Sequence, residues 1–178
     1  MGHAFCADRK VRDMDIAQLL AKLHADYADS IEQPEMGLDM PSGRVDVTRI
    51  DAVCRLLKED PDLRFDFLTD LCGVDHHPAT PRFEVVYHLH SLSLRYRLRL
   101  KCRVDTDQEV PTVTSVWSTA NWHERETYDM YGIRFHGHPD LRRIYLWDEF
   151  DGFPLRKDYP LRGYQDDYNP FGEPPATS

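Results

Sequence analysis

The sequence predicts one domain of the α+β class, because both helical and strand periodicity occur along the chain. Three segments have the apolar spacing or the end signals of helices. Two neighbouring segments near the middle alternate apolar and polar residues, as strands do. The chain has 178 residues, about the size of one domain, and 41% of them are hydrophobic, which is enough to bury a core.

Two helices are expected in the first third of the chain. The first covers residues 16–27, with one apolar stripe formed by Ile16, Leu19, Leu20, Leu23 and Tyr27. The second begins at Thr48, whose hydroxyl can cap it, and ends before Pro61. Its apolar face consists of Ile50, Val53, Cys54 and Leu57.

The segment between these helices is expected to be a loop over residues 33–43, because it contains two prolines and two glycines. A short strand is expected over residues 44–47, where polar and apolar residues alternate. A further strand is expected after the second helix, over residues 65–73.

The strongest strand signal covers residues 83–89 and 94–104, with a Ser-Leu-Ser turn between them. In the second of these segments every other residue is basic: Arg95, Arg97, Arg99, Lys101 and Arg103. This basic strand face can be a solvated surface or a docking face for an acidic neighbour, and the sequence leaves both interpretations open.

A third helix is expected over residues 122–131. Asn121 and Glu124 resemble a capping box at its beginning, and Gly132 suits its end. From Phe135 onward the periodicity disappears, while prolines, charges and aromatic residues are frequent. We therefore expect a core domain over residues 1–134 and, over residues 135–178, an extended partner-binding tail that is not an independent domain.

Composition and motifs exclude several functions. The net charge of −9 argues against a general nucleic-acid binder, and no apolar run is long enough to span a membrane. The four cysteines form no Cys-x-x-Cys pair, and no glycine-rich nucleotide motif is present. A catalytic zinc needs about three protein ligands, whereas His88 with His90, or His136 with His138, supply two, so we interpret these residues as surface or hydrogen-bonding histidines. We therefore expect no catalytic, cofactor-binding or metal-binding residues in this chain.

The region between residues 122 and 160 contains many acidic and basic residues interleaved with aromatic residues, and none of the excluded functions accounts for them. Arginine beside aromatic rings is typical of interface cores, where the guanidinium forms paired hydrogen bonds and stacks. The residues expected to form a signature and a partner interface are Trp122, Glu124, Arg125, Glu126, Asp129, Gly132, His138, Pro139, Asp140, Arg142, Arg143, Pro154, Arg156, Lys157, Asp158 and Pro160.

Three blocks of this region, in this order, resemble a known family. They are Ala-Asn-Trp-His-Glu-Arg-Glu-Thr-Tyr-Asp-Met-Tyr-Gly-Ile-Arg-Phe (120–135), Gly-His-Pro-Asp-Leu-Arg-Arg-Ile (137–144) and Gly-Phe-Pro-Leu-Arg-Lys-Asp-Tyr-Pro-Leu (152–161). The blocks closely resemble the 30 kDa subunit family, also called the C subunit, of respiratory complex I, the NADH–quinone oxidoreductase. The resemblance extends upstream to residues 68–75 and is weakest over residues 1–40.

This resemblance implies a two-layer α+β sandwich, with helices on one face of a mixed sheet and a long irregular C-terminal extension. It implies a cofactor-free structural subunit of the hydrophilic arm, which supports assembly beside the quinone-site subunit (the D subunit) and the iron–sulfur subunits. FMN, iron–sulfur clusters and quinone are then expected on neighbouring subunits. The expected location is the cytoplasmic face of the cell inner membrane, reached indirectly through the complex.

Two other functions stay open. The chain can be the equivalent subunit of a ferredoxin-dependent complex or a membrane-bound hydrogenase, because these share the fold and part of the signature. A more distant alternative is a free-standing metal-dependent enzyme that uses His88, His90 and nearby carboxylates.

Overall fold

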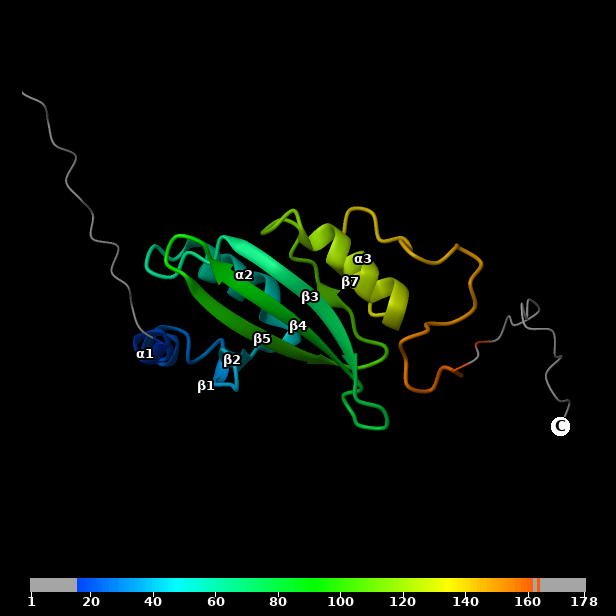
Figure 1. Cartoon of the computed structure of the whole chain (residues 1–178), viewed down its shortest axis with the longest axis horizontal. Helices are drawn as coiled ribbons and strands as arrows, with labels where there is room; N and C mark the ends of the chain where they lie inside the picture. Colours follow the sequence, from blue (N-terminus) through cyan, green and yellow to red (C-terminus); the bar gives the residue numbers. More distant parts are fainter. Residues whose placement is uncertain (1–15, 162, 164–178) are drawn as a thin grey trace, which may run out of the picture.

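The computed structural model describes residues 16–161 and residue 163, and it confirms the α+β class (Figure 1). Three helices accompany a five-stranded mixed sheet of order β1-β2-β5-β4-β3 and a two-stranded sheet of β6 and β7. The elements are α1 (Ile16–Asp26), β1 (Glu32–Met36), β2 (Pro41–Arg44), α2 (Ile50–Glu59), β3 (Phe67–Asp75), β4 (Phe83–Ser91), β5 (Tyr96–Val104), β6 (Val110–Pro111), α3 (Ala120–Tyr131) and β7 (Phe135–His136).

The core of the molecule lies on one face of the β3–β4–β5 meander, whose strands are antiparallel. Leu71, Tyr87 and Leu100 are paired across the three strands, and each is at most 1% exposed. Alternation of apolar and polar residues in β4 and β5 therefore separates a buried face from a polar face, as the sequence predicts.

The helices α2 and α3 pack on this buried face. Val53, Cys54 and Leu57 of α2 and Ala120 of α3 belong to the same buried core cluster as Tyr87 of β4. The α1 helix packs near the end of α2, where the Tyr27 hydroxyl donates a 2.7 Å hydrogen bond to Asp60. The two-layer arrangement implied by the resemblance is thereby confirmed.

The loop expected over residues 33–43 is wrong, since β1 and β2 form an antiparallel hairpin there. Pro34 lies in a bulge of β1, which is an edge strand, and Pro41 is the first residue of β2. Proline is tolerated at both of these positions because no ladder hydrogen bond is lost. The strand expected over residues 44–47 is also wrong beyond Arg44, because a 3-10 turn covers Val47–Arg49.

Two predicted helix caps are wrong. Thr48 lies inside the 3-10 turn, and Asp46 caps that turn by accepting a 2.8 Å hydrogen bond from the Thr48 amide. At α3 the helix begins at Ala120, so Asn121 is an internal residue and Glu124 turns away to another partner. The Gly132 prediction is correct, since this residue ends α3 in the left-handed conformation at φ 74°.

Two strand boundaries differ slightly from the predictions. β3 runs from Phe67 to Asp75 rather than over 65–73, and β5 begins at Tyr96 because Arg95 lies in the turn at φ 60°. Beyond β7 the described residues 137–161 contain neither helix nor strand and run past the C-terminal end of α3 (Figure 1). None of the helices within residues 16–161 is long and apolar enough to cross a bilayer.

Candidate functional site

The predicted signature residues are brought together by α3 and by residues 137–161, which we call the signature segment. The segment has no backbone ladder of its own and only scattered backbone hydrogen bonds, so side chains from α3 and from the β3–β4 end satisfy several of its polar backbone groups. The structure shows which signature residues do this and which face outward. The expected tail beyond Gly163 lies outside the described residues.

Asp129 is the main attachment point of the signature segment. Its carboxylate is fully buried, and one oxygen accepts hydrogen bonds from the amides of Ile144, Tyr145 and Leu146 at 2.8–3.0 Å. The other oxygen pairs with the Arg143 guanidinium at 3.0 Å. Burial opposes ionisation, but these donors outweigh it and hold the Asp129 pKa below its ordinary value.

Arg143 extends this attachment along the segment. Besides Asp129, its guanidinium donates to the carbonyls of Phe150 and Gly152 at 3.1 and 3.2 Å, and it lies over the Phe153 ring at 5.2 Å. Arg125 of α3 donates to the carbonyls of Arg142 and Arg143 at 3.1 Å each. The two arginines therefore order an irregular backbone that would otherwise leave carbonyls unpaired.

Glu124 and His138 form a buried pair at the other end of α3. Glu124 accepts from the Val113 amide at 2.8 Å and from the Thr112 hydroxyl at 2.5 Å, and burial raises its pKa to about 7. His138 lies 4.0 Å away with its side chain fully buried, and burial lowers its pKa. The Asp140 amide donates to His138 Nδ1, so Nε2 carries the proton and donates to the Asn121 carbonyl.

The end of the segment is fixed to the β3–β4 connection by a pair of residues that the signature prediction missed. Asp75 is 4% exposed and accepts from Arg82 through both carboxylate oxygens, and also from the Lys157 amide. Arg82 in turn pairs with Asp158 at 2.6 Å. These contacts hold the Asp75 pKa well below its usual range. A separation of 82 residues between Asp75 and Lys157 leaves no local sequence signal for the contact.

Gly132 and Arg156 join the end of α3 to the same segment. A Cβ atom at Gly132 would lie 2.6 Å from Arg156 Nη2 and 2.6 Å from the Phe153 ring. Arg156 donates to the Tyr131 carbonyl at 2.6 Å and lies over the rings of Phe153 and Phe83. Glycine is therefore required here both by the left-handed conformation and by the close approach of the segment.

The remaining predicted residues are exposed or half-buried. Arg142 is an exposed partner of Asp140, at 2.9 Å. The others of this group are Trp122, Glu126, Pro139, Lys157 and Asp158, which are exposed, and Pro154 and Pro160, which are half-buried. Large apolar side chains that the prediction did not include are exposed beside them: Tyr145, Trp147, Leu155 and Leu161. Adjacent residues of the signature thus have different surroundings: Glu124, Arg125 and Asp129 are buried, whereas other charged residues and several large apolar side chains are exposed.

The basic strand face predicted in β5 is partly neutralised within the chain. Arg99 pairs with Asp39 through two hydrogen bonds of 2.8 and 3.2 Å and also donates to His88. Arg103 donates to the Pro81 carbonyl, whereas Arg97 is exposed. In the part of the chain that the structure describes, no group of three His, Cys, Asp or Glu residues could hold a metal ion.

Comparison with known proteins adds an independent observation. Residues 44–165 match the family model described as respiratory-chain NADH dehydrogenase, 30 Kd subunit. An NADH-quinone oxidoreductase C subunit of Rhizobium etli is 60% identical over 153 residues, covering 85% of this chain and 82% of the relative. The protein of the same name from Rhizobium meliloti is 68% identical over 126 residues, covering 70% of this chain and 69% of the relative.

A more distant relative and a solved structure extend the comparison. The NADH-quinone oxidoreductase C subunit of a Roseiflexus species is 49% identical over 150 residues, covering 83% of this chain and 86% of the relative. The fold is similar to that of a chain in the membrane-bound sulfane sulfur reductase, an archaeal respiratory membrane complex. That likeness has a TM-score of 0.70 at 23% identity and covers 92% of this chain and 99% of the other.

Proposed function

This chain belongs to the family of the 30 kDa subunit of respiratory-chain NADH dehydrogenase, and from that premise we propose that it is a cofactor-free structural subunit of the hydrophilic arm of a proton-translocating NADH–quinone oxidoreductase. It supports assembly beside the D subunit, which contributes the quinone site, and beside the iron–sulfur subunits. FMN, the clusters and the quinone are bound by those neighbours. The chain is peripheral, on the cytoplasmic face of the membrane, and takes part in catalysis only as a member of the complex.

The use of the signature charges supports this proposal most directly. Most hydrogen bonds of Asp129, Arg143 and Arg125 are formed with the backbone of the signature segment. At the far end of the segment, Asp75 accepts one from the Lys157 amide. A catalytic acid or base needs access to a reacting group, whereas Asp129 is fully buried and surrounded by donors of this chain. This arrangement supports a role in shaping a surface rather than in chemistry.

The surface that they shape has the composition of a protein interface. Trp122 and Trp147 are 61% and 55% exposed, and Arg142 is exposed between them in sequence. Tryptophan, tyrosine and arginine are the residues that most often contribute large binding energies at interfaces.

An alternative is the equivalent subunit of a ferredoxin-dependent complex or a membrane-bound hydrogenase. The fold itself is shared with a chain of another respiratory complex, so fold alone does not identify the electron donor. The partners do. A flavin- and NADH-binding subunit belongs to the first assignment, and a subunit with nickel-binding cysteines belongs to the hydrogenase.

Affinity purification from native membranes in mild detergent tests the proposal. We expect the tagged chain to co-purify with a flavin- and NADH-binding subunit, iron–sulfur subunits and a quinone-site subunit, and the preparation to oxidise NADH with quinone. The chain released from the complex should have no flavin or cluster absorbance. Isolation of the chain alone from such membranes, or a stoichiometric chromophore in the released chain, would contradict the proposal.

A further inference from the structure

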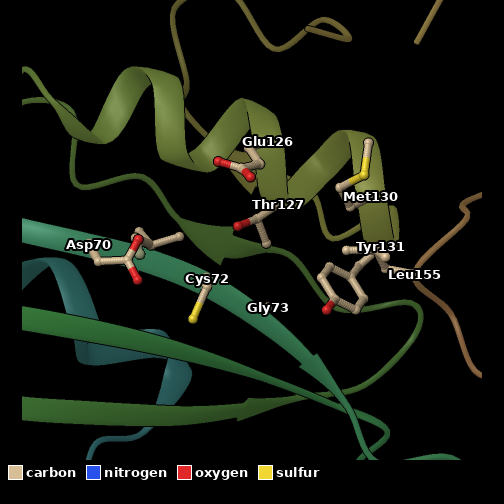
Figure 2. Close-up of a pocket in the computed structure, with 9 residues that line it drawn as sticks. Asp70, Cys72, Gly73, Glu126, Thr127, Met130, Tyr131 and Leu155 are labelled. Atoms are coloured by element: carbon tan, nitrogen blue, oxygen red, sulfur yellow. The ribbon is translucent and has the colours of Figure 1, made fainter. Parts of the chain in front are cut away.

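A groove runs between the outer edge of β3 and α3 (Figure 2). Its volume is about 220 Å³. Four consecutive strand residues line one side, and the helix and the signature segment line the other: Asp70, Leu71, Cys72, Gly73, Glu126, Thr127, Met130, Tyr131 and Leu155. Small-molecule pockets are usually larger, at roughly 300–1,000 Å³. The groove therefore suits a few side chains of a polypeptide better than a cofactor.

The strand that forms this groove has an open edge. β3 is the last strand of the sheet and pairs only with β4 among the described strands. Across the described residues, the backbone groups of Leu68–Val74 form no hydrogen bonds outside the β3–β4 ladder. An exposed edge of this kind accepts an added strand from another chain, which gains main-chain hydrogen bonds along it.

One end of the groove is acidic. Asp70 is near only the imidazoles of His88 and His123, at 3.7 and 3.5 Å, and no Lys or Arg pairs with Asp70 or Glu126 in the described part of the chain. Burial and the neighbouring Arg99 lower the pKa of His88, so it is neutral at pH 7. A basic side chain entering here would find two carboxylates without a permanent cationic partner.

The far end of the groove indicates which other kind of residue the docked segment carries. Thr127 lines the middle of the groove but is only 2% exposed, so it offers little contact surface there. At the far end Met130, Tyr131 and the exposed Leu155 provide an apolar contact.

We propose that this groove receives an extended segment of a neighbouring subunit, which pairs with the outer edge of β3. The segment carries a Lys or Arg opposite Asp70 and Glu126. An apolar residue, an even number of positions away so that it faces the same side, contacts Met130 and Leu155. This inference rests on the proposed function and adds to it a defined docking mode.

Photo-crosslinking in the assembled complex tests the position of the segment. p-Benzoylphenylalanine is placed at Leu155, which is 52% exposed beside the groove, or at Leu56, which is 51% exposed on α2 and serves as the matched control. The Leu155 probe should crosslink to one short segment of one neighbouring subunit that contains a Lys or Arg. A fully assembled complex whose Leu155 probe gives no more intersubunit product than the Leu56 probe would overturn the proposal.

A charge substitution tests the chemistry of the same groove. The double variant Asp70→Asn with Glu126→Gln should bind the complex roughly two- to thirtyfold more weakly, and retention of wild-type chain should depend more steeply on salt than retention of the variant. The matched control, Glu59→Gln with Asp62→Asn, alters two exposed carboxylates at the C-terminal end of α2 and just beyond it, and should bind like wild type. If the Asp70/Glu126 variant and the control variant bind equally well and with equal salt dependence, the proposed docking in the groove is wrong. Co-purification of the chain with the complex would still support the proposed function.

Discussion

Replacing Asp129 with asparagine tests how strongly the fold depends on the attachment of the signature segment. In the native structure one carboxylate oxygen accepts three backbone amides, and the other faces the Arg143 guanidinium. An asparagine side chain has one oxygen and one NH2 group, so it can satisfy only one of these sides. Whichever way the amide is turned, NH2 hydrogens face either the guanidinium or the three amides.

The expected cost follows from burial. Asp129 is fully buried and the Arg143 side chain is 13% exposed, so solvent screens this pair weakly. Breaking a buried pair from one side costs about 3–5 kcal/mol, because a charge and its donors are left without a partner. The Asp129 pKa is held below its ordinary value of 3.8. This stabilisation is therefore fully present above pH 3.8 and is lost as the pH falls through the lower folded-state pKa.

Urea unfolding at pH 7, followed by tryptophan fluorescence, measures the difference. Asp129→Asn should lower the free energy of unfolding by about 3–5 kcal/mol with an unchanged m-value. Asp140→Asn is the matched control, because Asp140 is 56% exposed and its surface pair with Arg142 contributes less than about 1 kcal/mol. If the free energy of unfolding falls by less than about 1 kcal/mol in both variants, Asp129 is not the main attachment point of the signature segment.

Two further predictions concern the ends of α3. Because the Glu124 pKa is raised from 4.5 to about 7 in the folded chain, the free energy of unfolding should fall by about 3 kcal/mol as the pH rises from about 4.5 to 7, since the unfolded chain releases its proton first. Glu124→Gln should remove this pH-dependent contribution, so the stability of the variant relative to wild type should be greater at pH 8 than at pH 5. If urea unfolding shows that the variant loses the same free energy of unfolding at both pH values, the raised Glu124 pKa is wrong. Gly132→Ala should cost about 1–3 kcal/mol more than Gly137→Ala, because both glycines have positive φ but a Cβ at Gly137 approaches only Thr112, at 3.4 Å. Equal melting temperatures for the two alanine variants would refute the packing argument.

Sequence periodicity correctly predicted the helices and strands that bury one face and expose the other. The apolar face of α2 and the alternation of β4 and β5 are direct consequences of packing on a single core, so the sequence pattern and the structure agree. The β1–β2 hairpin was missed for a physical reason. Pro34 and Pro41 normally signal a loop, but an edge bulge and a strand's first position tolerate them.

The signature could be located from the sequence, but the role of each residue could not. Arg142 and Arg143 are neighbours in an irregular segment, where no repeat indicates which side chain faces inward. Only the fold shows that Arg143 is paired with a buried carboxylate and that Arg142 is exposed. Glu124 was expected to cap α3, whereas the chain folds so that Val113 and Thr112 use its carboxylate.

In the proposed function the signature charges support assembly rather than chemistry, and Arg143→Ala tests this role most directly. The measurement is quinone-dependent NADH oxidation in membranes, divided by the amount of assembled complex on a native gel, with Arg142→Ala as the matched control. Arg143→Ala should reduce the amount of complex while the turnover of each assembled complex stays near the wild-type value, and Arg142→Ala should preserve more of the complex. A full amount of complex with greatly reduced turnover in Arg143→Ala would contradict the structural role and indicate a direct part in the reaction.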